Sequence, residues 1–182
     1  MICIISGTNR PNSSTLKVAE YIYDYLKEHQ DDPINLLTLE DLPGDVLNNL
    51  MYEKAGQSQY IADLQDRLLI PSSRWIIVTP EYNGSYAGVF KLFLDALSVR
   101  KYDETFTNKH VALFGISTGR AGNLRGMEHL TGVLNYLKMH VFPEKLPISS
   151  IHDIIGEDDE LETWTKKGIN DVLNEFLIFA PA

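Results

Sequence analysis

The sequence predicts an α/β fold in which helices cover both faces of a parallel sheet. Three observations carry this prediction: short apolar segments rich in β-branched residues, amphipathic segments between them, and a regular alternation of the two kinds along the chain. The apolar segments show no strict alternation of apolar and polar residues, which is typical of strands buried on both faces. The expected architecture is a three-layer sandwich.

Five strands are expected, of which the first four are strongly apolar and the fifth is weaker and ends at Pro143. They span Ile2–Ser6, Ile34–Leu39, Trp75–Thr79, His110–Ile116 and Lys138–Phe142. Right-handed crossovers between five parallel strands favour the flavodoxin-like order 2-1-3-4-5.

Helices are expected between and after these strands, because apolar residues recur there at helical spacing. They span Thr15–His29, Ser58–Leu69, Val89–Val99, Leu124–Leu137 and Asp159–Ile178. The acidic run Glu157–Glu162 is interpreted as the solvated start of the last helix, where the helix dipole favours negative charge. The helix Val89–Val99 carries more apolar surface than one sheet face can cover, which predicts a homodimer or homotetramer.

Length and composition set further expectations. The chain has 182 residues and no repeat or linker-like tract, which predicts a single domain over residues 1–182. A net charge of −9 argues against nucleic acid as a partner. No signal-peptide pattern or membrane-length apolar stretch is visible, so we expect a cytoplasmic protein with no membrane partner. The one cysteine, Cys3, is expected to be buried, and the histidines lack metal-ligand spacing, so no metal is expected.

Three loops are expected to meet at one ligand site. Ligands of open parallel sheets bind at the carboxyl ends of the strands, near the point where strand order reverses. The loops expected there read GTNRPNSST (7–15), PEYNGSYAG (80–88) and STGRAG (117–122). Each loop is polar, contains glycine and leads into a helix. The irregular stretch 41–57 is long enough to be a lid or an interface.

The first loop suits a phosphate group. It precedes a helix, whose first N–H groups are free and whose dipole attracts anions. Hydroxyl donors and one charged guanidinium are added by Thr8, Ser13, Ser14, Thr15 and Arg10. The alternative is that Ser13 or Ser14 only caps the helix, although capping requires just one of these residues. The loop has neither a Walker sequence nor a G-x-G-x-x-G fingerprint, which favours a monophosphate.

The second and third loops suit a flat polar heterocycle. The second loop combines acidic, aromatic and amide side chains at Glu81, Tyr82 and Asn83. Pro80 stiffens the turn, and Gly84 allows the backbone to approach a ligand closely. The alternative is an ordinary strand-to-helix turn with exposed tyrosines. The third loop, around Ser117 and Gly119, offers N–H groups that can stabilise the negative charge of a reduced flavin, although this motif is weak by itself.

Together, GTNRPNSST, PEYNGSYAGVFKLFLDAL and STGRAGNLRG resemble the NAD(P)H-dependent FMN reductases, a flavodoxin-like group that includes quinone, azo-dye and chromate reductases. The resemblance runs from residue 1 to about residue 143, and PEYNGS is its most specific piece. It implies FMN as cofactor and NADPH or NADH as electron donor. Because the flavin carries the chemistry, no side chain is expected to be catalytic.

The resemblance also implies where the cofactor lies. The phosphate is expected on Thr8, Arg10, Ser13 and Thr15. The isoalloxazine is expected along Pro80, Glu81, Tyr82, Asn83 and Gly84, with Ser117 and Gly119 on its far edge. Three positions depart from the family pattern, namely Thr15 for a common asparagine, Ala87 for a proline and Ala96 for a tryptophan. The last two bear on the following helix and the subunit interface more than on the flavin.

The expected function is reduction of a small acceptor, such as a quinone, free flavin, azo compound or metal oxyanion. Hydride would pass from NAD(P)H by way of flavin N5 in a ping-pong order. One alternative is a flavodoxin-type electron carrier that serves a protein partner. Another is a binding or regulatory module of the same fold with a different phosphorylated ligand.

Overall fold

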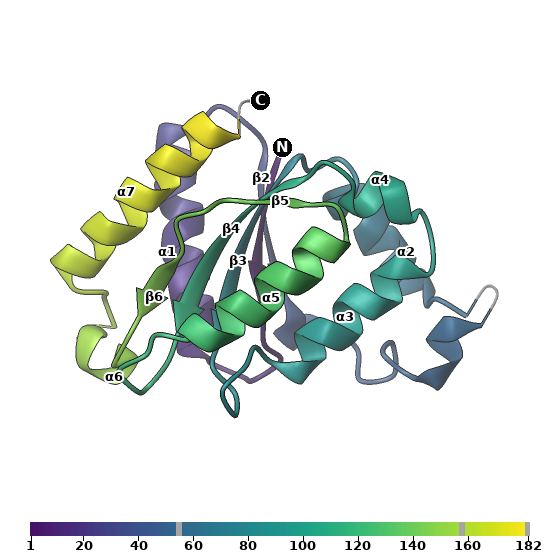
Figure 1. Cartoon of the computed structure of the whole chain (residues 1–182), viewed down its shortest axis with the longest axis horizontal. Helices are drawn as coiled ribbons and strands as arrows, with labels where there is room; N and C mark the ends of the chain where they lie inside the picture. Colours follow the sequence, from purple (N-terminus) through teal and green to yellow (C-terminus); the bar gives the residue numbers. More distant parts are fainter. Residues whose placement is uncertain (54–55, 157–158, 181–182) are drawn as a thin grey trace.

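The central feature of the fold is a parallel sheet (Figure 1). The computed structural model describes residues 1–53, 56–156 and 159–180. Its strands are β1 (Ile2–Ser6), β2 (Ile34–Thr38), β3 (Arg74–Pro80), β4 (His110–Ile116), β5 (His140–Val141) and β6 (Leu146–Ile148). They pair in parallel in the order β2-β1-β3-β4-β5, with β6 also beside β4. The predicted strand order is therefore confirmed.

The fifth position of the sheet is divided between two short strands. β5 pairs with His110 and Val111 at the start of β4, whereas β6 pairs with the last three residues of β4. The expected strand Lys138–Phe142 is thus reduced to two residues. Lys138 has a positive φ of 63°, which excludes it from a strand, and Pro143 follows closely without a backbone donor. At this edge of the sheet, Pro147 is tolerated within β6.

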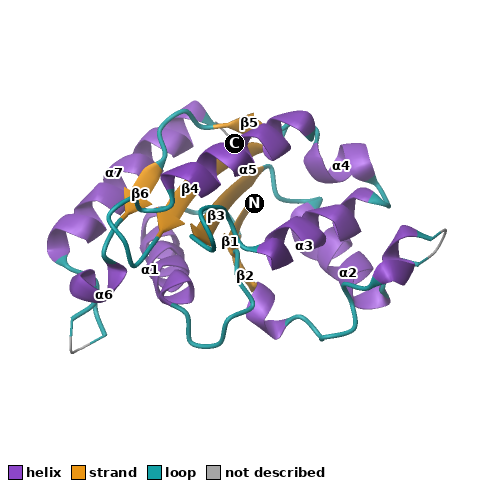
Figure 2. Ribbon diagram, turned by 60° about the horizontal axis from the view of Figure 1, so that its bottom comes forward, coloured by secondary structure: helices purple, strands orange, loops and turns teal. Residues whose placement is uncertain are grey.

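Helices form a layer on each face of the sheet (Figure 2). The longer ones are α1 (Ser14–His29), α3 (Gly88–Ser98), α5 (Leu124–Tyr136) and α7 (Thr163–Phe179). The shorter ones are α2 (Gln59–Leu64), the π-helical turn Gln65–Leu69, α4 (Tyr102–Phe106), α6 (Ile151–Ile154) and the 3-10 helices Leu39–Asp41 and Asn49–Tyr52. α1 and α7 lie side by side on one face, where Tyr21 donates to the Asn170 side-chain oxygen at 2.9 Å. α3 and α5 cover the other face (Figure 1).

Two apolar cores result from this layering. Along β1, Ile2 and Ile4 join the core beneath α1 and α7, whereas Cys3 and Ile5 join the core beneath α3 and α5. Both sets are fully buried, which explains the continuous apolar run in the sequence. The expected burial of Cys3 is confirmed, and this burial raises the pKa of its thiol to about 12.

The predicted start of the last helix is wrong. α7 begins at Thr163, four residues after the expected Asp159. The preceding segment forms a turn instead, with an antiparallel bridge between Ile155 and Leu161 and a positive φ of 67° at Asp159. Leu161 is buried in the core and holds this turn in place. Glu157, the first residue of the acidic run, lies outside the described residues.

Two other segments differ from a simple helix or loop. The expected helix Ser58–Leu69 changes from α-helical to π-helical geometry at Gln65. The stretch 41–57 contains a short 3-10 helix at Asn49–Tyr52, and its residues 54–55 lie outside the described ranges. Across the described part of the chain, no helix combines the length and apolar character needed to cross a membrane.

The carboxyl ends of β1, β3 and β4 emerge at one edge of the sheet, since the strands are parallel. Figure 2 is turned so that this edge comes forward. The loops that follow the three strands therefore lie together, as the strand order requires.

Candidate functional site

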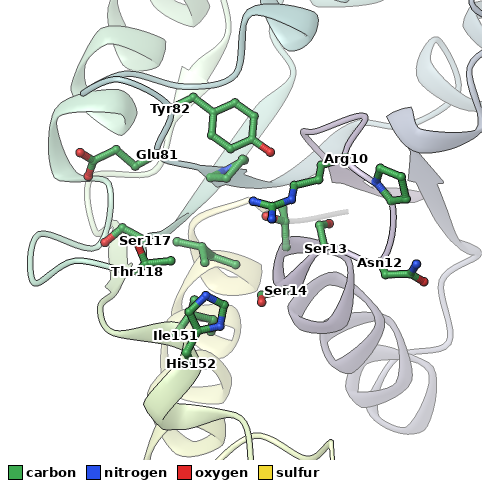
Figure 3. Close-up of a pocket in the computed structure, with 14 residues that line it drawn as sticks. Arg10, Asn12, Ser13, Ser14, Glu81, Tyr82, Ser117, Thr118, Ile151 and His152 are labelled. Atoms are coloured by element: carbon green, nitrogen blue, oxygen red, sulfur yellow. The ribbon is translucent and has the colours of Figure 1, made fainter.

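A cavity of about 290 Å³ opens between these loops (Figure 3). Its volume is near the lower end of the roughly 300–1,000 Å³ typical of small-molecule sites. Most of the predicted binding residues line it, namely Arg10, Ser13, Ser14, Thr15, Pro80, Glu81, Tyr82 and Ser117. The remaining four do not line it, namely Thr8, Asn83, Gly84 and Gly119. The three loops thus converge as the sequence predicts.

The start of α1 presents free backbone donors to this cavity. Ser13 caps the helix, since its Oγ accepts from the Leu16 N–H at 3.1 Å. No hydrogen bond within the described residues uses the N–H groups of Ser14 or Thr15, and both residues line the cavity. Capping therefore occupies one acceptor and leaves the donors of this turn available to an anion.

Arg10 adds positive charge to the same end of the cavity. Its side chain is exposed and makes no hydrogen bond or ion pair with other described residues. Figure 3 shows the guanidinium between Tyr82 and Ser13. A guanidinium with no internal carboxylate partner can pair with a phosphate through two parallel hydrogen bonds. Glu81, the acidic residue of the lining, belongs to the second loop.

Thr8 supports the walls of the cavity. It is buried, and its hydroxyl lies 2.8 Å from the Tyr82 hydroxyl. The same oxygen accepts from the Arg10 N–H at 3.2 Å. One side chain thereby fixes the turn that carries Arg10 and links the first loop to the second.

The second loop is a tight two-residue turn. Tyr82 and Ser85 exchange backbone hydrogen bonds of 2.8 and 3.1 Å across it. Asn83 and Gly84 have positive φ values of 53° and 77°, as in a type I′ turn, for which Asn-Gly is the favoured sequence. Within the described residues, no hydrogen bond uses the N–H of Asn83 or Gly84. The turn thus leaves two backbone donors without a partner in the described part of the chain.

The third loop is held by its own serine. Ser117 Oγ donates to the Gly119 carbonyl at 2.8 Å and accepts from the Gly122 N–H at 2.9 Å. Asn123, the N-cap of α5, donates from its side chain to the Thr79 carbonyl at 2.9 Å. The ends of β3 and β4 are therefore fixed to each other next to the cavity.

Sequence reasoning missed one wall of the site. Ile151 and His152 of α6 line the cavity. Four residues of helix are too few to give a periodic apolar pattern, so the segment could not be recognised as helical. Its approach to the cavity depends on hydrogen bonds from Ser150 and Ile151 to the third loop, which no local pattern predicts.

A comparison with known protein families identifies the family to which the chain belongs. The family model described as NADPH-dependent FMN reductase matches residues 1–153 of the 182-residue chain. The chain belongs to this family. The resemblance seen in the three loops is confirmed.

Individual relatives agree with this assignment over parts of their length. An NAD(P)H-dependent FMN reductase of Pseudomonas aeruginosa is 42% identical over 65 residues, 36% of this chain and 35% of that protein. A 2-hydroxy-1,4-benzoquinone reductase of a Burkholderia species is 33% identical over 102 residues, 50% of this chain and 56% of that protein. The matched segments thus span less than two thirds of either relative.

A solved structure supports the fold. The flavoenzyme NAD(P)H:(acceptor) oxidoreductase FerB of Paracoccus denitrificans superposes with a TM-score of 0.76 at 20% sequence identity. The superposition covers 98% of this chain and 96% of that one. At this identity, the likeness establishes the flavodoxin-like fold.

The hydrogen-bond donors that line the cavity of this FMN reductase family member are suited to FMN. Two free N–H groups, nearby hydroxyls and the unpaired Arg10 suit a phosphate dianion at the start of α1. Pro80 and Tyr82 offer flat apolar surface in the same cavity. Asn83 and Gly84 follow Tyr82 along the chain without lining the cavity, and their N–H groups have no partner among the described residues.

Proposed function

We propose that the protein transfers electrons from NAD(P)H to a small acceptor by way of FMN held in this cavity. When bound, FMN supplies a ring that accepts hydride at N5 and then passes two electrons to a quinone, free flavin, azo compound or metal oxyanion. If the nicotinamide and the acceptor used the same face of the ring, NAD(P)⁺ would have to leave before the acceptor entered, and this predicts ping-pong kinetics. The cytoplasm, where NAD(P)H is available, is the proposed location.

In this proposal the residues of the protein bind FMN and orient it. Arg10, Ser13, Ser14 and Thr15 hold the phosphate, and Thr8 fixes the turn on which Arg10 lies. The ring would lie along Pro80, Glu81 and Tyr82, with Ser117 at its far edge; Asn83, Gly84 and Gly119, which do not line the cavity, would reach it through neighbouring backbone. The observation that carries the proposal is the set of free donors at the start of α1, in one cavity with Pro80 and Tyr82.

A quinone is the acceptor class with the best support. One relative is named a 2-hydroxy-1,4-benzoquinone reductase and another an FMN-dependent NADH:quinone oxidoreductase. A planar quinone can stack on a flat ring, and this geometry requires no specific side chain.

A flavodoxin-type electron carrier is the second candidate. Tyr82 bonds to Thr8 at the edge of the cavity, so an aromatic side chain is available to cover the ring, as in such carriers. A carrier takes its electrons from a protein partner, whereas a reductase accepts them from NAD(P)H directly.

The deciding experiment is a visible spectrum of the FMN-loaded protein before and after anaerobic addition of NADPH or NADH. Rapid bleaching of the flavin band, followed by recovery when a benzoquinone is added, is the expected result. A bound flavin that stays yellow with both nicotinamides would favour the carrier. A protein that binds no FMN would exclude both functions.

We also propose a homodimer formed through a groove between α3 and α5. Most apolar side chains of α3 pack in the core, but Tyr136 on α5, which lines this groove, is 82% exposed. The groove between these helices has a volume of about 560 Å³. At the rim of the groove, Lys91 donates a hydrogen bond to Asp95, and this bond raises the pKa of Lys91. The charge of Lys91 is therefore already paired.

Light scattering at micromolar concentration tests this interface. We expect a dimer for the wild type and a monomer for Tyr136→Glu, which introduces an unpaired charge into the groove. Glu128→Gln, a change at an exposed residue of α5 outside the groove, is the control. A monomeric wild type would contradict the proposal.

A further inference from the structure

His152 brings a second basic side chain to the cavity. Among the 14 lining residues, Arg10 and His152 are those that can carry a positive charge, and Glu81 is the one acidic residue. Figure 3 shows the imidazole near Ser14, on the opposite side of the cavity from Tyr82. Arg10 and His152 therefore approach the start of α1 from two different elements.

The backbone that carries His152 is firmly placed. The Ser150 N–H donates to the Gly119 carbonyl at 2.9 Å, and the Ile151 N–H donates to the Ser117 carbonyl at 3.1 Å. Ile151 is buried in the core. The third loop and α6 thus form one unit, in which His152 is directed to the cavity while Ile151 anchors the helix.

The imidazole itself has no internal partner. No hydrogen bond or ion pair within the described residues engages its ring nitrogens. The charged groups on the surrounding elements are Arg10, Glu81, Arg120, Asp153, and Lys17, which pairs with Asp159. The ring nitrogens of His152 are therefore free to bond to a ligand.

We propose that His152 binds the phosphate of the flavin together with Arg10 and so selects phosphorylated flavin over riboflavin. The proposal rests on the FMN site proposed above. A ring nitrogen of histidine can donate a hydrogen bond, and hydrogen bonds to an ionised phosphate are stronger than those between neutral groups. In a chain of net charge −9, an added local donor opposes the general repulsion of an anion.

The test measures dissociation constants of FMN and riboflavin by flavin fluorescence under one set of buffer conditions. For His152→Ala we expect FMN binding to weaken about three- to tenfold, because an exposed hydrogen bond to a charged group is lost. Riboflavin, which lacks the phosphate, should bind His152→Ala and wild type alike.

Two further variants sharpen the test. His152→Lys places a charged hydrogen-bond donor at the same position, so it should retain the preference for FMN over riboflavin. Asp153→Asn alters a charge on the same helix outside the cavity and is the matched control. Urea unfolding midpoints show whether each variant is folded before its affinity is interpreted.

The outcomes separate the two proposals. If wild type binds FMN but His152→Ala binds it equally well, the inference is wrong and the proposed function stands. Equal losses of FMN and riboflavin would likewise overturn it, because they would indicate a contact with the ring. A wild-type protein that binds no FMN would refute the proposed function, and the inference with it.

Discussion

Arg10 is the side chain that contributes most positive charge to the end of the cavity where the phosphate is proposed to bind. Its guanidinium lines the cavity without an internal partner, so its removal leaves no buried charge unpaired. Arg10→Ala should weaken FMN binding by about 1–3 kcal/mol, the range for hydrogen bonds to charged groups. Riboflavin, which lacks the phosphate, should bind Arg10→Ala and wild type alike.

The control for this prediction is Arg67→Ala, which removes the same charge from a residue that lines a different pocket, beside α2. It should leave both affinities unchanged. FMN affinity that is equal in wild type and Arg10→Ala, measured by fluorescence titration, would remove Arg10 from the phosphate site.

At the level of residues, the sequence predicts most of the cavity lining but not the function of every residue. Arg10, Ser13 and Thr15 could be chosen because free helix donors, hydroxyls and a guanidinium share one chemistry. Thr8 belongs to the same pattern, but its hydroxyl bonds to Tyr82, and this partner is 74 residues away. His152 depends on a contact between distant segments, which local sequence cannot show.

At the level of elements, the turn from Tyr82 to Ser85 sets the geometry of the second loop. Gly84 has φ of +77°, and an added Cβ would meet just Arg125 Nη1, at 3.8 Å. The cost of Gly84→Ala is therefore backbone strain without a clash, about 1–2 kcal/mol. We expect this loss in the free energy of urea unfolding, together with weaker FMN binding, because the free donors of the turn shift.

Gly88→Ala is the matched control for this turn. Gly88 begins α3, its added Cβ would meet nothing within 4 Å, and its φ is not positive. The change should leave stability the same or raise it by up to roughly 1 kcal/mol. If both variants were equally stable, the positive φ of Gly84 would not constrain the loop.

The elements that sequence reasoning placed correctly are those with long patterns. α1 and β4 were predicted to within one residue at each end, since a continuous stripe or apolar run defines them. α7 was predicted too early, because the acidic run satisfies the rule for helix starts while the burial of Leu161 favours a turn. β6 was missed because three residues that include Pro147 carry no strand pattern.

At the level of the whole molecule, the strand order could be predicted because alternating strands and helices admit few right-handed arrangements. The position of the ligand site followed from the same topology, as parallel strands bring their carboxyl ends to one edge. The opposite edge was not predicted. There, the rings of His110 and His140 lie 5.2 Å apart, and Phe179 of α7 packs against His110 with centroids 5.6 Å apart.

This opposite edge makes the stability of the whole fold depend on pH. Burial, and then the charges of His140 and Arg74, lower the pKa of His110 below its usual value. Between that lowered pKa and the unfolded value of about 6.5, the unfolded chain binds a proton that the folded chain does not. Stability should therefore fall as the pH falls below about 6.5, by at most about 1.4 kcal/mol per pH unit for one proton.

Urea unfolding of flavin-free protein between pH 5 and 8 measures this dependence without a contribution from cofactor binding. His110→Gln removes the titrating ring and should give a flatter curve than wild type below pH 6.5. Parallel curves for wild type and His110→Gln would mean that the contact between α7 and the sheet is indifferent to protonation.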